Sequence, residues 1–180
     1  MTIDVSIPEY LKDFFELTTT ISKPSADHRT IAIVGVSFID DGVREILELA
    51  MPGLNSKLRD KIFDGYGPLS TLAARLDVAR ALGLMRPHEH TMIVSLARIR
   101  NRMAHSLHVH NFDHPDVAKI LDEIEITVTD GATGKETTQK GPFDGQPRWS
   151  FYQTCIGGVA MSIQRVRTER WLARNGDRKN

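Results

Sequence analysis

Apolar residues recur every three or four positions along most of this chain, which is the spacing of helices that bury one face. The pattern predicts seven helices, at about 8–23, 27–51, 55–63, 68–82, 87–108, 113–124 and 148–175. No long strand pattern with alternating polarity interrupts this series. We therefore expect an all-α, up-and-down helical bundle of about six to seven helices.

Residues with known preferences for helix ends lie at several of these boundaries. Candidate capping side chains precede three helices: Ser25 or Asp27, Asn55, and Asp113. Proline occupies an expected first-turn position in several others: Pro8, Pro68, Pro87 and Pro115. Gly83 is the expected end of the fourth helix.

The segment from 126 to 147 departs from the helical pattern. It begins with alternating apolar residues and continues through polar residues and glycines, so we expect one small hairpin or loop insertion there. The whole chain, 1–180, is expected to form a single helical domain, with residues 176–180 as a frayed basic tail.

Two stripes follow different sides of the fifth predicted helix. The first is apolar and is expected to face the core: Met92, Leu96, Ile99, Met103 and Leu107. The second has mostly small side chains: Val94, Ala97, Asn101 and His105. Small side chains let another helix approach closely, so this side contacts either a neighbouring helix of the same chain or a second subunit.

Composition limits the classes of partner. The chain has 180 residues, 41% of them hydrophobic, which suffices for one compact core. Basic and acidic residues number 23 each, so there is no strongly basic coat for nucleic acid. A single cysteine excludes an internal disulfide, and neither a signal peptide nor an apolar run of membrane-spanning length is evident. A cytoplasmic location, with no membrane partner, is the default expectation.

Positive charge is nevertheless concentrated locally. Residues 90–112 include three arginines and four histidines but no aspartate or glutamate. Arg100 and His105 lie close together in this stretch. A guanidinium suits phosphate oxygens and an imidazole exchanges protons near neutral pH, so the pair suits chemistry on RNA.

The hexamer from Arg100 to His105, RNRMAH, resembles the R-N-x-x-x-H signature of HEPN domains. The segment from Phe63 to Met85, FDGYGPLSTLAARLDVARALGLM, looks like the one that precedes this signature in the mannitol operon repressor family and related HEPN-like proteins. The resemblance implies a HEPN-like helical dimer. Many HEPN domains are metal-independent endoribonucleases, often toxins or defence effectors. The resemblance therefore also implies this activity here, with an antitoxin as one expected partner.

On that resemblance, single-stranded RNA would be cleaved without a cofactor. His105 would handle a proton, Arg100 would stabilise the charge growing on the phosphorane, and Asn101 would position the reacting groups. Arg98 and Arg102 flank this site as candidate RNA-binding residues, the alternative being solvated surface arginines.

Helix geometry makes dimerisation a prediction. Over five residues an ideal helix turns by ~500°, which leaves Arg100 and His105 about 140° apart. A two-fold axis between two such helices would bring both pairs into one cleft. The candidate dimer interface is the second stripe described above: Val94, Ala97, Asn101 and His105.

The alternative function is a non-enzymatic regulator like the mannitol operon repressor, acting through a protein partner. A DNA-reading role is not favoured, because the helix after Gly83 has few base-reading polar residues at its start and places Met92, Ile93 and Leu96 in the core. The histidines around the signature include His88, His90, His108, His110 and His114. Their spacing matches no metal motif, so we expect no metal site and interpret them as surface or capping residues. Cys155 is expected to be a buried, inert thiol.

Overall fold

The computed structural model describes residues 27–129 and 133–176, together with Lys12, Glu16 and Thr19. The helix predicted at 8–23 and the tail beyond 176 lie outside the fully described ranges. The described helices are α2 (His28–Ala50), α3 (Ser56–Phe63), α4 (Leu72–Ala81), α5 (Pro87–His105), α6 (Pro115–Asp122) and α7 (Arg148–Gly176). The strands are β1 (Glu125–Thr129) and β2 (Glu136–Lys140). The prediction of an all-α bundle with one small hairpin is confirmed.

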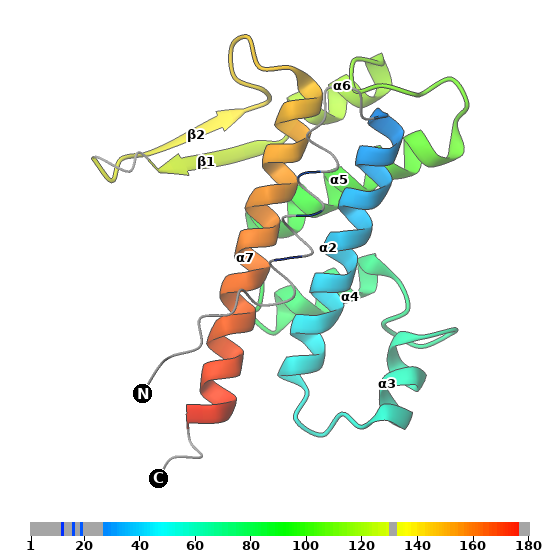
Figure 1. Ribbon diagram of the computed structural model, residues 1–180, viewed down its shortest axis with the longest axis vertical. Coiled ribbons are helices and arrows are strands. Elements are labelled where there is room, and N and C mark those ends of the chain that lie inside the picture. The colour runs from blue at the N-terminus through cyan, green and yellow to red at the C-terminus, as the bar shows by residue number, and fades with distance from the viewer. Residues whose placement is uncertain (1–11, 13–15, 17–18, 20–26, 130–132, 177–180) are drawn as a thin grey trace.

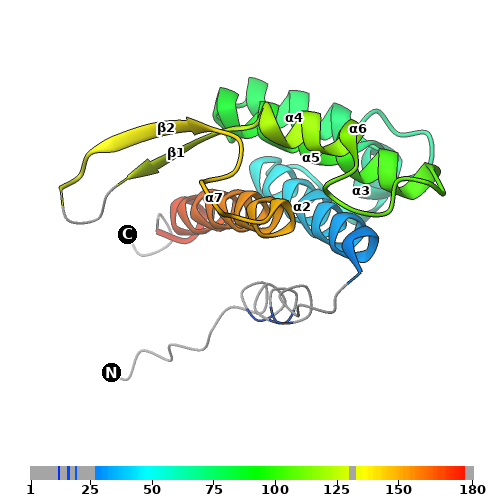
Figure 2. The same ribbon diagram turned by 90° about the horizontal axis from the view of Figure 1, so that it is seen from above.

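The helices form two layers, which Figure 2 shows from above. The long helices α2 and α7 lie side by side in one layer, and α4, α5 and α6 cover one face of that pair. The two strands pair antiparallel, with Glu125 opposite Lys140, and the hairpin projects from the side of the bundle (Figure 1). Helix α5 therefore has one face on α2 and α7 and another directed away from them.

One hydrophobic cluster joins the helices. On α5 the fully buried apolar residues are Ile93, Leu96, Ile99 and Met103, so the predicted core stripe is largely correct. The prediction that Leu107 faces the core is wrong, because Leu107 lies beyond the end of α5 and is 86% exposed. Trp171 is 57% exposed near the end of α7, beyond Val166, which is buried.

Most predicted helix ends are confirmed at the level of individual side chains. The Asp27 carboxylate accepts a hydrogen bond from the backbone N–H of Thr30, and Asn55 caps α3 in the same way. The cap of α6 is His114, not Asp113 as predicted. Pro115 still takes the first turn, because a proline needs no hydrogen-bond acceptor for its nitrogen there.

Replacing Asp27 with alanine is expected to lower the free energy of unfolding by about 1 kcal/mol at neutral pH. The backbone N–H of Thr30 holds the pKa of Asp27 below its usual value of 3.8. A lowered folded-state pKa means that the stabilisation is complete above the unfolded value and is lost as the pH falls through the folded value. Urea unfolding from pH 7 to pH 2 should therefore show the difference from wild type shrinking below about pH 4. A difference that stays constant with pH would contradict this account, and Asp27→Asn provides the uncharged control.

The fourth helix begins four residues later than predicted. Pro68 was expected in its first turn, but α4 starts at Leu72 with Thr71 as its cap. The preceding residues form a turn instead, in which the N–H of Leu69 donates to the carbonyl of Ile62 at the end of α3. Gly83 ends the helix as predicted, with a positive φ of 69°.

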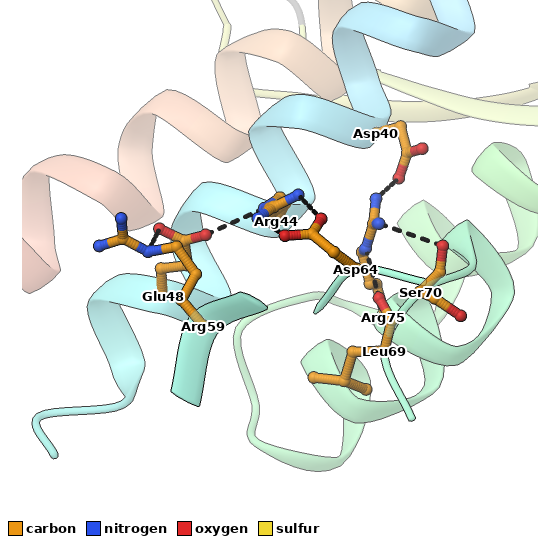
Figure 3. Close-up of polar contacts among 8 residues, drawn as sticks. All are labelled: Asp40, Arg44, Glu48, Arg59, Asp64, Leu69, Ser70 and Arg75. Atoms are coloured by element: carbon orange, nitrogen blue, oxygen red, sulfur yellow. Dashed lines mark hydrogen bonds and ion pairs between the residues drawn. The ribbon is translucent and has the colours of Figure 1, made fainter. Parts of the chain in front are cut away.

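A polar network fastens this turn to α2 (Figure 3). The Arg75 side chain is buried and donates to the Asp40 carboxylate and to the carbonyls of Leu69 and Ser70. Beside it, Arg44 donates to both oxygens of Asp64. These contacts stabilise the connection between α3 and α4, which few buried apolar residues support.

The fifth helix ends at His105, three residues before the predicted end. Ser106 is extended, with φ of −119° and ψ of 123°. Arg29 of α2 donates to the carbonyls of Ser106 and Val109, at 2.9 and 3.3 Å. A positive charge near the C-terminus of a helix also interacts favourably with the negative end of the helix dipole. Arg29 therefore stabilises the early end of α5.

Candidate functional site

The outward face of α5 is hollowed near its C-terminal end. Five residues line this depression of about 390 Å³: Arg98, Asn101, Arg102, His105 and Ser106. They are spaced by three, four or one residue, which places them on one side of the helix. Four of the residues proposed from the sequence are therefore brought together here. We call this feature the α5 hollow.

Arg100 does not line the α5 hollow. Its Nη1 donates to Oδ1 of Asn101 at 3.0 Å, and its Nε is buried without a hydrogen-bond partner. The guanidinium also lies near the phenol of Tyr152 on α7, since it partly opposes the rise in the pKa of Tyr152 that burial causes. Arg100 is thus partly buried, whereas His105 is exposed. Within one chain the structure does not bring these two side chains together.

The second stripe of α5 is open. Asn101 and His105 are exposed, Val94 is 37% exposed, and Ala97 is partly buried against the core. No helix among residues 27–129 and 133–176 covers this side, so a neighbouring helix within these ranges is not its partner. The face remains available to a second molecule, and the subunit interface stays a prediction.

The two arginines of the α5 hollow differ in their partners. Arg102 lies 3.6 Å from Asp116 of α6, and more than half of each side chain is exposed. Such an exposed pair contributes at most about 1 kcal/mol. Arg98 makes no ion pair with the described residues. No carboxylate lines the α5 hollow, which is therefore rich in hydrogen-bond donors.

Two neighbouring residues were missed or misplaced by the sequence patterns. Ser106 lines the hollow as the residue that directly follows the last residue of α5, and no pattern in the sequence pointed to it. Leu107 was placed in the core, yet it lies exposed next to the hollow because α5 ends at His105.

The histidines outside the signature and Cys155 were the other candidates for chemistry. Among residues 27–129 and 133–176, no three His, Cys, Asp or Glu side chains are grouped as a metal site. His114 caps α6, as a capping histidine should. Cys155 is buried, and burial raises its pKa to about 12, so its thiol is unreactive as predicted. None of the described helices is both long enough and apolar enough to cross a lipid bilayer.

Comparison with known proteins gives one informative match, at the level of the fold. No protein-family model and no curated protein sequence matches this chain. A chain in the X-ray structure of the MtlR–HPr complex from Escherichia coli superposes on it with a TM-score of 0.57 and 15% sequence identity. The match covers 86% of this chain and 97% of that one. The chain therefore shares its fold with a chain of that complex, while membership of the HEPN superfamily or of the mannitol operon repressor family stays a prediction.

Proposed function

We propose that this protein is a non-enzymatic regulator that acts by binding a protein partner, like the mannitol operon repressor family that its sequence resembles. The observation that carries the proposal is the superposition of this protein on a chain from a complex between MtlR and HPr. The match covers 97% of the length of that chain. A fold that extends over the whole of such a chain includes the surfaces on which a partner can dock.

The geometry of α5 agrees with binding rather than catalysis in a single chain. A nuclease site needs its cation and its proton-transfer group on the same phosphate. Arg100 and His105 instead lie on different sides of α5, and Arg100 is engaged with Asn101. The exposed side chains that line the α5 hollow can bind another molecule, and binding does not require Arg100 and His105 to reach the same phosphate.

The proposal predicts that the purified protein binds HPr from its own organism as a folded complex. Isothermal titration calorimetry and size-exclusion chromatography should show a saturable complex with micromolar or lower Kd, corresponding to about −8 kcal/mol. A heat-unfolded sample of the same protein is the control. Absence of binding at concentrations of about 1 mM would contradict HPr as the partner.

The endoribonuclease is the second candidate, because the α5 hollow brings together Arg98, Asn101, Arg102 and His105. In this case a dimer must supply Arg100 from the second copy. Labelled single-stranded RNA incubated with the protein in EDTA should then be cleaved, and the cleavage should disappear in Arg100→Ala and in His105→Ala. A protein that stays monomeric, or that leaves the RNA intact, would rule this candidate out.

A further inference from the structure

We propose that the α5 hollow, with Leu107 beside it, is the docking surface for an acidic segment of a protein partner. The inference rests on the proposed function, since it names the surface that the partner would contact. It is carried by the chemistry of the residues that line the hollow.

The α5 hollow is lined by two guanidiniums and by no carboxylate. Its charged groups are the guanidiniums of Arg98 and Arg102. The Asn101 carbonyl oxygen already accepts from Arg100, which leaves the amide nitrogen as a donor. The Ser106 carbonyl likewise accepts from Arg29, which leaves the hydroxyl. A surface of this kind is complementary to carboxylates, which only accept hydrogen bonds and pair strongly with arginine.

Both arginines are available to a partner. Arg98 has no ion pair with the described residues. The contact between Arg102 and Asp116 is long, at 3.6 Å, and largely exposed, so an incoming carboxylate can replace it at little cost. The two arginines are four residues apart on α5, which separates them by ~6 Å along the helix axis. Alternate residues of an extended chain are about 7 Å apart, so two acidic residues separated by one other residue match this spacing.

A protein segment fits this surface better than a nucleic acid does. No Phe, Tyr or Trp side chain lines the hollow, so the His105 imidazole is the one aromatic ring among the lining residues on which a base could stack. The sequence has 23 basic and 23 acidic residues, which gives no general attraction for a polyanion. Leu107 is 86% exposed immediately after the hollow. An exposed leucine beside arginines is a combination found in protein–protein interfaces, where apolar contacts lie next to charged ones.

The test compares the wild-type protein with the double variant Arg98→Gln/Arg102→Gln and with the control Arg80→Gln. Arg80 is exposed on α4 and does not line the hollow. Each protein is titrated at low salt with an acetylated hexaglutamate peptide and with HPr. Both ligands should bind the wild type and the control with equal affinity. Their affinity for the double variant should be lower by a factor of about ten or more. All three proteins should unfold within about 4 °C of one another, because the substituted side chains are exposed and the Arg102–Asp116 pair contributes at most about 1 kcal/mol.

The outcomes separate this inference from the proposed function. Equal binding of HPr to the wild type and to the double variant would show that the partner docks elsewhere, and would overturn the inference while the function stands. Loss of peptide binding in the double variant, with no HPr binding to any of the three proteins, would support the surface and exclude HPr. Binding of single-stranded decauridylate in place of the peptide would overturn the proposal of a protein occupant.

Discussion

Gly67→Ala is expected to lower the free energy of unfolding by about 3 kcal/mol, among the largest effects of any single substitution in this chain. A Cβ atom at this position would lie 2.3 Å from the carbonyl oxygen of Ile62 and 2.6 Å from that of Lys61. Both are backbone atoms in the last turn of α3, so they cannot rotate out of the way. The turn would have to move, which would break the hydrogen bond from the Leu69 N–H to the Ile62 carbonyl.

The matched control for this substitution is Gly53→Ala. Gly53 is exposed after α2, and an added Cβ there would meet no atom within 4 Å. Its replacement should change the free energy of unfolding by less than about 0.5 kcal/mol. Urea unfolding followed by far-UV circular dichroism measures both values. Similar values for the two variants would show that the close approach at Gly67 does not constrain the turn.

Arg75→Met is expected to cost about 3 kcal/mol for a different reason. Methionine keeps the length of the side chain but has neither charge nor donors. The carbonyls of Leu69 and Ser70 would lose their donors, which approach to 2.8 and 3.2 Å. The Asp40 carboxylate would lose its cation, although its side chain is 27% exposed and water would compensate part of that loss. The expected loss of unfolding free energy is therefore at the lower end of the range for breaking a buried ion pair, which is about 3–5 kcal/mol.

A control and a double-mutant cycle isolate this contribution. Arg80→Met lies on the same helix at an exposed position and should change the free energy of unfolding by less than about 0.5 kcal/mol. Combining Arg75→Met with Asp40→Asn should give a coupling energy of about 1–2 kcal/mol in urea unfolding. Strictly additive effects would mean that the Arg75–Asp40 pair contributes nothing beyond the contacts of Arg75 with the two carbonyls.

These two positions give a physical reason for part of the sequence resemblance. The segment from Phe63 to Met85 contains Asp64, Gly67, Leu69 and Arg75, and all four take part in fastening the connection between α3 and α4 to the bundle. The sequence pattern identified the segment as distinctive. Its role depends on Asp40 and Arg44 of α2, which bind Arg75 and Asp64 of the segment (Figure 3).

Helix ends were predicted well where the cause is local. Asp27, Asn55 and Gly83 act on backbone groups within a few residues, so the sequence contains all the information needed. The two larger errors have partners far along the chain. The end of α5 is held by Arg29, 77 residues away from Ser106, and the late start of α4 depends on a turn that binds the end of α3.

The sequence by itself determined the helical bundle, its hairpin and the positive charge around α5, because periodicity, capping residues and composition are local properties. Only the tertiary structure decided which of those charged side chains share a surface. Packing of α5 on α2 and α7 directs Arg100 inward and leaves Arg98, Arg102 and His105 exposed together. The physical reason is that a helix presents its residues in all directions, and only its neighbours determine which of those directions meet solvent.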